Sequence, residues 1–210
     1  MYVPPAFAES DRERLAEQIE QHSFATLVSQ HDGRPIASHL PLLWDREPEP
    51  FGQLWGHMAR ANPQWTQADG QTVLAVFSGP HAYITPTWYA AENVVPTWNY
   101  VAVHVTGTLR LINDPETLLQ LMQRTVDHYE QPRPEPWEFQ GSPEFLEKLL
   151  AMIVGFRIDI EHIEGQTKLS QNHAVERRER VIRGLRDETD PQAAAIADLM
   201  QATLERESTE

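Results

Sequence analysis

Short runs of alternating apolar and polar residues dominate the first two thirds of the chain and predict β-strands. The runs 24–29 and 36–43 flank Asp32-Gly33, an arrangement typical of an antiparallel hairpin. Further strands are expected at 54–58, 72–77, 81–89, 100–112 and 156–161. Gly79-Pro80 separates two of these runs, and Pro86 would confine the second to a sheet edge or an irregular end. The pattern predicts an antiparallel β fold of six or seven strands.

Helical periodicity is confined to a few segments, each of which begins at a capping residue. Ser10 followed by Glu13 resembles a capping box and predicts an opening helix that ends near Gln21. Asp114-Pro115 and Ser142-Pro143 each place a capping side chain before a proline, which suits the first helical position. The fold class is therefore mainly β with added helices.

The character of the chain changes beyond Ala174, where no strand pattern returns. Glu176 and Arg180 are spaced four apart, as in a helix with stabilising ion pairs, and Asp190-Pro191 begins a last helix. We divide the chain into a β-rich domain, residues 1–172, and a charged, α-helical C-terminal extension, residues 173–210.

The formal charge is −14, from 31 acidic and 17 basic residues, which disfavours direct contact with nucleic acid. The local exception is the segment 176–186, which holds five arginines. This segment either contacts DNA phosphates or is a solvated helix packed on a dimer partner, and we prefer the second interpretation. The absence of cysteine excludes disulfides, thiolate metal sites and a cysteine nucleophile.

No apolar run approaches the roughly 20 residues needed to cross a bilayer, and the first residues do not resemble a signal peptide. We expect a cytoplasmic protein with no membrane partner. The nine histidines show no recognised metal spacing, so no metal site is expected.

The segment from Gly56 to Trp65 combines a strand end, a fixed cation and a helix start. Arg60 offers a planar fork of donors that matches phosphate oxygens, and Asn62-Pro63 resembles a cap with the first helical residue. Free N–H groups at that helix start would add to an anion site. Taken alone, the segment favours the simpler interpretation of a strand, a tight turn and a short surface helix that carries a solvated arginine.

Several further stretches crowd small polar and aromatic residues into strand ends. With the segment above, they are Met1 to Pro4, Ser38 to Leu42, Gly56 to Gln64, Phe77 to Tyr89, Val95 to Tyr100 and Lys168 to Asn172. In this order they resemble the PaiB family of FMN-binding negative transcriptional regulators, which are related in fold to the pyridoxamine-phosphate oxidase-like split barrels. The resemblance extends from residue 1 to about residue 172.

The resemblance implies a six-stranded antiparallel split barrel that forms a homodimer, with FMN in each of two clefts between the subunits. Arg60 matches the basic residue that holds the FMN phosphate in such barrels, whereas Ala61 stands where the oxidases often carry lysine. Lys168 becomes a candidate second cation. Asn172 departs from the basic residue of the oxidases, so their substrate is not carried over.

The candidate cofactor-binding residues are Ser38, His39, His57, Arg60, Asn62, Gln64, Lys168, Ser170, Gln171 and Asn172. Trp88 and Trp98 are candidate walls for the flavin ring, although Trp98 suits a core or a dimer interface equally well. No catalytic residue is assigned. The resemblance implies a transcriptional regulator or flavin-linked sensor, and a flavin-dependent oxidoreductase acting on a small molecule or haem is the alternative. Direct DNA contact is implied by the family but not favoured by the charge.

Overall fold

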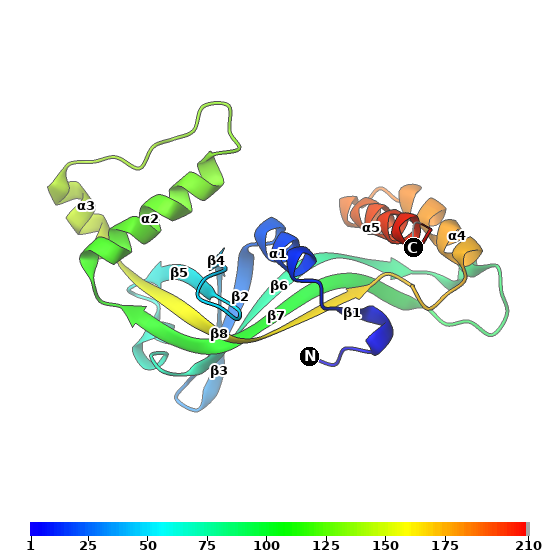
Figure 1. Cartoon of the computed structure of the whole chain (residues 1–210), viewed down its shortest axis with the longest axis horizontal. Helices are drawn as coiled ribbons and strands as arrows, with labels where there is room; N and C mark the ends of the chain where they lie inside the picture. The colour runs from blue at the N-terminus through cyan, green and yellow to red at the C-terminus, as the bar shows by residue number, and fades with distance from the viewer. Residues whose placement is uncertain (209–210) are drawn as a thin grey trace. The chain divides into compact units, whose positions relative to one another are not determined.

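The structure is a computed structural model in which residues 1–208 are described (Figure 1). Its strands are β1 Ala8–Glu9, β2 Phe24–His31, β3 Arg34–Pro41, β4 Leu43–Asp45, β5 Gln53–Ala59, β6 Thr72–Ile84, β7 Thr97–Ile112 and β8 Ile153–Lys168. Its α-helices are α1 Arg12–Gln21, α2 Pro115–Glu130, α3 Pro143–Leu150, α4 Val175–Arg186 and α5 Pro191–Glu207, and its 3₁₀ helices are η1 Pro5–Phe7, η2 Pro63–Gln67 and η3 Pro86–Tyr89.

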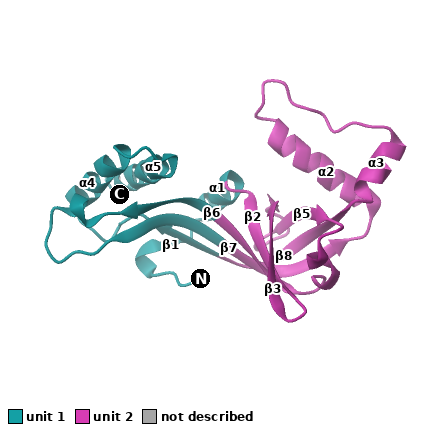
Figure 2. Cartoon of the chain, turned by 180° about the vertical axis from the view of Figure 1, so that it is seen from behind, with its two compact units in different colours: residues 1–21, 78–103, 164–210 teal, residues 22–77, 104–163 magenta. Residues whose placement is uncertain are grey.

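The chain divides into two compact units, coloured teal and magenta in Figure 2. Unit 1 comprises Met1–Gln21, Ser78–Val103 and Glu164–Glu210, and unit 2 comprises His22–Phe77 and His104–Ile163. The long strands β6, β7 and β8 contribute residues to both units. The predicted division into residues 1–172 and residues 173–210 stays a prediction. Its second part extends two residues beyond the described residues, which end at 208.

The strands form one sheet in the order β3-β2-β6-β7-β8-β5-β4, and β1 pairs with β8. The pairs β1/β8, β2/β3, β2/β6, β4/β5 and β5/β8 are all antiparallel. The predicted antiparallel, mainly β fold is confirmed, although the sheet has eight strands where six were expected. The two added strands, β1 and β4, are only two and three residues long.

The hairpin of β2 and β3 forms as predicted. His31 pairs with Arg34, which leaves Asp32 and Gly33 as the two turn residues. Their φ angles are 50° and 71°, the positive values that a two-residue turn of the favoured hand requires. The turn chemistry therefore fixes the register, and alternation along β2 buries Ala25, Leu27 and Ser29 on one face.

Two predicted boundaries were wrong. The opening helix is capped by Asp11 and not by Ser10, because the Asp11 carboxylate accepts the N–H groups of Glu13 and Arg14. Gly79-Pro80 does not end a strand, since β6 continues to Ile84 and only 86–89 form the helix η3. The pairing of β6 with β2 ends at Val76, so Pro80 lies where β6 has no β2 partner and a missing N–H is tolerated on that side.

Unit 2 packs the long helix α2 beside strands of the sheet. The caps predicted for α2 and α3 form, with Asp114 accepting the N–H of Thr117 and Ser142 accepting that of Phe145. A glycine at position 107 permits close approach of β8, because a Cβ there would lie 2.3 Å from the Asp159 carbonyl oxygen.

Unit 1 has its own apolar core, in which α4 and α5 pack on the end of β6 and on η3. The cluster consists of Ala82, Ile84, Tyr89, Leu169, Val181, Ile182, Leu185, Ala193, Ile196, Ala197, Met200 and Leu204. The last helix begins at its predicted cap, where Asp190 accepts the N–H of Gln192. The arginine-rich helix α4 therefore packs one face into the core of its own unit, so it is less solvated than we expected, whereas its packing on a dimer partner stays a prediction.

Candidate functional site

Arg60 follows β5 directly and is held in place by main-chain carbonyls. Its own N–H donates to the carbonyl of Met152, its Nε donates to the carbonyl of Ala151 at 2.8 Å, and its Nη2 donates to that of Ile153 at 2.7 Å. The guanidinium has five donors, so three remain for a ligand. Because the residue is exposed, these donors are accessible to a ligand. The two carbonyl contacts fix the direction of the guanidinium before a ligand binds.

Asn62 joins this turn to β3. Its Nδ2 donates to the hydroxyl of Ser38 at 2.7 Å, and its Oδ1 accepts the N–H of Gln64 at 3.0 Å. The cap that the sequence predicted is therefore present. The helix that follows is a 3₁₀ helix of five residues, and the N–H of Gln64 is already used by the cap. Helix N–H groups are thus a smaller part of this anion site than we expected, and side chains are the larger part.

Gln64 is fully buried and braces the hairpin. Its Nε2 donates to the carbonyl of Leu27 at 3.1 Å and to the hydroxyl of Ser29 at 3.0 Å. The side chain is therefore committed to β2, and only its Oε1 has no partner among the described residues.

His39 is exposed on β3 and belongs to a small surface cluster. Its Nδ1 lies 3.0 Å from the hydroxyl of Thr26, and its ring stacks on Phe24 with 6.4 Å between ring centroids. Phe24 is 68% exposed. This cluster is open to a ligand or to another protein surface.

His57 lies on the face of β5 that α2 covers. It pairs with Gly155 of β8, and a Cβ at Gly155 would lie 2.6 Å from the Leu118 side chain of α2. Paired residues project to the same face, so His57 also points toward α2. Burial lowers the pKa of His57 below its ordinary value, and its Nδ1 has no partner among the described residues.

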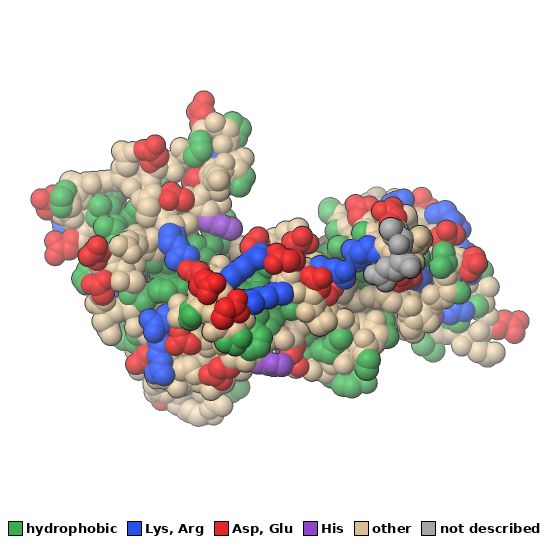
Figure 3. All heavy atoms as spheres, in the orientation of Figure 1, with side chains coloured by type: hydrophobic (Ala, Val, Ile, Leu, Met, Phe, Trp, Pro, Cys, Tyr) green, Lys and Arg blue, Asp and Glu red, His purple; other side chains and the backbone are tan. Residues whose placement is uncertain are grey.

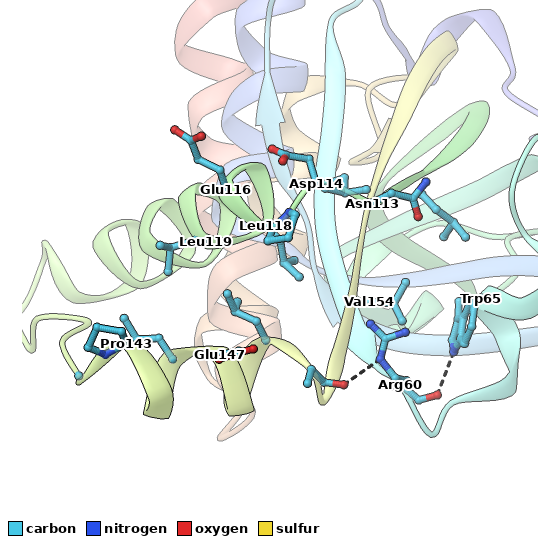
Figure 4. A pocket seen from close by; sticks show the side chains of 17 residues that line it. Arg60, Trp65, Asn113, Asp114, Glu116, Leu118, Leu119, Pro143, Glu147 and Val154 are labelled. Carbon is cyan, nitrogen blue, oxygen red and sulfur yellow. Dashed lines mark hydrogen bonds between the residues drawn. The ribbon is translucent and has the colours of Figure 1, made fainter.

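A cleft of about 710 Å³ opens beside Arg60 in unit 2 (Figure 4). We call it the α2–α3 cleft. Its walls are mostly apolar and include Trp65, Leu111, Leu118, Leu119, Leu146, Leu150 and Val154. Arg60 lies at one end beside Trp65, whose Nε1 donates to the Arg60 carbonyl at 2.9 Å. Glu116 and Glu147 place carboxylates on the rim. The cleft can therefore accept an apolar group next to a cation.

The four candidates near the end of β8 belong to unit 1. Lys168 donates from Nζ to the hydroxyl of Thr97, and burial lowers its pKa below the ordinary lysine value. Ser170 is buried, has a positive φ of 65° and exchanges hydrogen bonds with Asn99. Gln171 bonds the main chain of Thr167 and Leu169, and Asn172 is exposed.

The ten candidates thus fall into two groups. Ser38, His39, His57, Arg60, Asn62 and Gln64 lie in unit 2, and Lys168, Ser170, Gln171 and Asn172 lie in unit 1. Among these candidates, Asn62 donates to the hydroxyl of Ser38 and accepts the N–H of Gln64, and both contacts lie in unit 2. In the described chain, 1–208, no three His, Asp or Glu side chains are arranged to hold a metal ion. No helix in that range is long and apolar enough to span a membrane.

Comparison with known proteins assigns the family. Residues 1–162 match the family model described as "Putative FMN-binding domain". The chain belongs to this FMN-binding family. The resemblance to PaiB is confirmed by a Bacillus subtilis relative, "Protease synthase and sporulation protein PAI 2", which is 39% identical over 99% of this chain and 100% of its own length. An uncharacterised Aspergillus fumigatus protein is 32% identical over 88% of this chain and 90% of its own.

Solved structures place this FMN-binding family member among flavin-binding split barrels by fold. The flavocytochrome Anf3 from Azotobacter vinelandii superposes with a TM-score of 0.61 at 14% identity, covering 77% of this chain and 69% of that one. The FAD and haem binding protein from Mycobacterium smegmatis gives 0.59 at 15% identity, covering 77% and 73%. At these identities the likeness establishes the fold.

The hydrogen-bond donors around Arg60 suit FMN, the cofactor of this family. Its phosphate needs several N–H or O–H donors and a positive charge, and the three uncommitted donors of Arg60 meet that need. Ser38 and Asn62 add a hydroxyl and an amide that are already oriented toward each other. Lys168 lies in unit 1, where burial lowers its pKa below the ordinary lysine value, and its role as a second cation stays a prediction.

The arginines of α4 are largely used within unit 1. Arg177 lies over the ring of Tyr89, 5.3 Å from its centroid, and Arg180 donates to the Tyr89 carbonyl at 2.9 Å. Arg178 is buried and paired with Glu207. Arg183 and Arg186 are exposed. On the face seen in Figure 3, basic side chains lie among acidic ones.

Thr97 and Asn99 were not among the predicted site residues, yet they hold Lys168 and Ser170. Both lie in the stretch Val95 to Tyr100 that carried the family resemblance, so a signal was present. The carbonyls of Ala151 and Ile153, which orient Arg60, had no signal in the sequence because any residue supplies a carbonyl.

Proposed function

We propose that the protein is a homodimeric, flavin-linked sensor of the PaiB type that represses transcription, with Arg60 holding the FMN phosphate. The observation that carries the proposal is the state of the Arg60 guanidinium, which is exposed, fixed by two carbonyls and left with three donors. Fixing the side chain beforehand reduces the conformational entropy lost when an anion binds. The cytoplasmic location remains a prediction.

Bound FMN would supply reversible electron transfer, which suits a sensor or an oxidoreductase. The residues of this chain would bind and orient it. Arg60 would neutralise phosphate charge, and the pair of Ser38 and Asn62 would donate hydrogen bonds beside it. His57 lies on β5, the strand that directly precedes Arg60, and pairs with Gly155 of β8.

Homodimer formation is supported by exposed aromatic surface. Phe24 is 68% exposed and stacks on His39, which leaves an apolar ring on the surface of unit 2. Such surface is often covered by a second copy. Sedimentation of Phe24→Glu should show a shift toward monomer, with Phe24→Tyr as the control. An unchanged dimer would place the interface elsewhere.

Titration of FMN into the purified protein tests the phosphate site. Arg60→Ala should weaken binding by about 10- to 100-fold, because charge-assisted hydrogen bonds contribute about 1.5–3 kcal/mol. Arg60→Lys should recover part of the loss, since it keeps the charge without the fork. Ala61→Lys should leave the affinity equal or improved.

Arg34→Ala is the matched control, because it removes an exposed arginine from the hairpin of the same unit. Far-UV circular dichroism checks that each variant is folded. If Arg60→Ala binds FMN as tightly as the wild type, the phosphate is held by other residues.

A flavin-dependent oxidoreductase is the second candidate. It is favoured because most of the α4 arginines contact other residues of the chain and are not available to DNA. Three of the five arginines in that helix contact Tyr89 or Glu207, and the chain carries a formal charge of −14. Both facts weaken direct binding to DNA. Steady turnover of NADH or NADPH with an electron acceptor would support the oxidoreductase. Salt-dependent binding to promoter DNA that Arg183→Ala and Arg186→Ala weaken would support the regulator.

A further inference from the structure

A second pocket, of about 430 Å³, lies entirely in unit 1. It is formed by β6, η3, β7 and the connection between α4 and α5. We call it the aromatic pocket, and its lining includes His81, Tyr83, Trp88, Trp98, Glu188 and Asp190. Its volume is within the range of sites for small organic molecules. Arg60, Ser38 and Asn62 of the FMN phosphate site proposed above are not part of this lining, whereas Trp88 and Trp98 are the two tryptophans named from the sequence as candidate flavin walls.

The rings of the aromatic pocket are arranged around Trp98. Its centroid lies 5.8 Å from that of Tyr83, edge to face, and 6.1 Å from that of His81. Tyr83 is 49% exposed and Trp98 is 52% exposed, so their ring surface is accessible. The pocket therefore presents π surface to whatever enters it.

Trp88 forms a fixed wall of the same pocket. A Cβ at Gly184 of α4 would lie 2.4 Å from the Trp88 ring, so the ring is packed directly on the helix backbone. The absence of a side chain at position 184 thus sets the position of the indole. Because its position is determined by core packing, this wall needs little rearrangement to receive a ligand.

The charges that line the aromatic pocket are acidic. Glu188 and Asp190 are both exposed, and no lysine or arginine is part of the lining. The carboxylate of Asp190 accepts the N–H of Gln192 as a helix cap. Two carboxylates beside three aromatic rings create a negative potential in the pocket.

We propose that the aromatic pocket binds an organic cation of the alkylammonium class. The faces of tryptophan and tyrosine attract such cations, and desolvation in a pocket strengthens this attraction. Glu188 and Asp190, which also line the pocket, add Coulomb attraction for the same cation. A pocket of about 430 Å³ with acidic and aromatic lining suits a small organic cation.

Isothermal titration of the full-length protein with choline tests the proposal. The matched probe is 3,3-dimethyl-1-butanol, which has nearly the shape of choline but no charge. We expect choline to bind and the neutral probe to bind at least tenfold more weakly. Trp98→Ala should weaken choline binding about tenfold or more, and Trp98→Phe should recover part of it.

The charge contribution is tested with the double variant Glu188→Gln, Asp190→Asn. Asparagine caps a helix about as well as aspartate, so α5 should remain intact. Choline affinity should fall several-fold. The control is Glu179→Gln, which removes an exposed carboxylate of α4 outside the pocket lining and should leave the affinity unchanged.

Equal affinity for choline and the neutral probe would overturn the proposal, as would a folded wild type that does not bind choline. Unchanged choline affinity in folded Trp98→Ala would do the same. If Trp98→Ala does not fold, the double charge variant decides. If the wild type does not bind choline and Trp98→Ala changes the sedimentation of the protein, the surface around Trp98 is a protein interface and the proposal fails.

Discussion

Replacing Glu207 with alanine should destabilise the protein, because the buried guanidinium of Arg178 would lose its counter-ion. Arg178 is 1% exposed, and its Nη1 lies 2.5 Å from a carboxylate oxygen of Glu207. Its Nε and Nη2 have no partner among the described residues. The ion pair joins α4 to the end of α5, so its contribution to the free energy of unfolding shows how strongly it holds these two helices together.

The expected loss is smaller than for a fully buried pair. Breaking such a pair costs about 3–5 kcal/mol. The Glu207 side chain is 45% exposed, however, so water can partly replace it. Glu207 also ends α5, where a carboxylate opposes the helix dipole and its removal returns a few tenths of a kcal/mol. We expect a net loss of about 1–3 kcal/mol, which corresponds to about 2–10 °C in Tm for a chain of this size.

Arg178→Met supplies the contrasting perturbation. Methionine fills a similar volume without a charge, so stability should stay within about 1 kcal/mol of the wild type or rise. In the Arg178→Met background, Glu207→Ala should have almost no effect. The double-mutant cycle, measured by urea unfolding, should therefore give a coupling energy of about 1–3 kcal/mol.

Additive effects in that cycle would refute the reasoning, because they would mean that the pair does not contribute to stability. A loss larger than 3 kcal/mol in folded Arg178→Met would refute it as well. That result would show that the two donors without described partners form stabilising bonds.

Three further predictions concern stability. Gly184→Ala should cost about 1–3 kcal/mol in urea unfolding, because its Cβ would overlap the Trp88 ring, and Gly184→Ala combined with Trp88→Leu should recover part of the loss. Gln64→Ala should cost about 1–3 kcal/mol by leaving the Leu27 carbonyl without its side-chain donor, whereas Gln67→Ala should cost less because its bonds are exposed. Burial lowers the pKa of His57, so stability from the neutral ring should be lost as pH falls through about 6.5, and a His57→Gln variant with an undiminished slope between pH 5 and 8 would contradict this.

The local structure of this protein was largely predictable from the sequence. The β2–β3 hairpin follows from Asp32-Gly33, and the caps at Asp114, Ser142 and Asp190 begin helices where predicted. These features depend on interactions within four residues, so the sequence contains all the information needed. The alternation that predicted 100–112 as a strand also held, because Val101, Val103 and Val105 are buried.

Predictions that depended on distant neighbours were less successful. Gly79-Pro80 suggests a break, but β6 continues through it, since that part of the strand lacks a β2 partner to need the missing N–H. Gln64 resembles a cofactor ligand by its position after Asn62-Pro63, whereas its side chain is committed to β2. Neither outcome is encoded near the residue itself.

The candidate site divides in the same way. The sequence by itself determined the family and its FMN cofactor, because residue types in a fixed order carry that information, and it led us to propose Arg60 as the cation that holds the phosphate. Only the tertiary structure decided which donors remain available. It occupies two donors of Arg60 with carbonyls from residues about 90 positions away, and it turns the α4 arginines toward Tyr89 and Glu207. A side chain's chemistry is a property of its residue type, whereas its free hydrogen bonds depend on which segments the fold brings beside it.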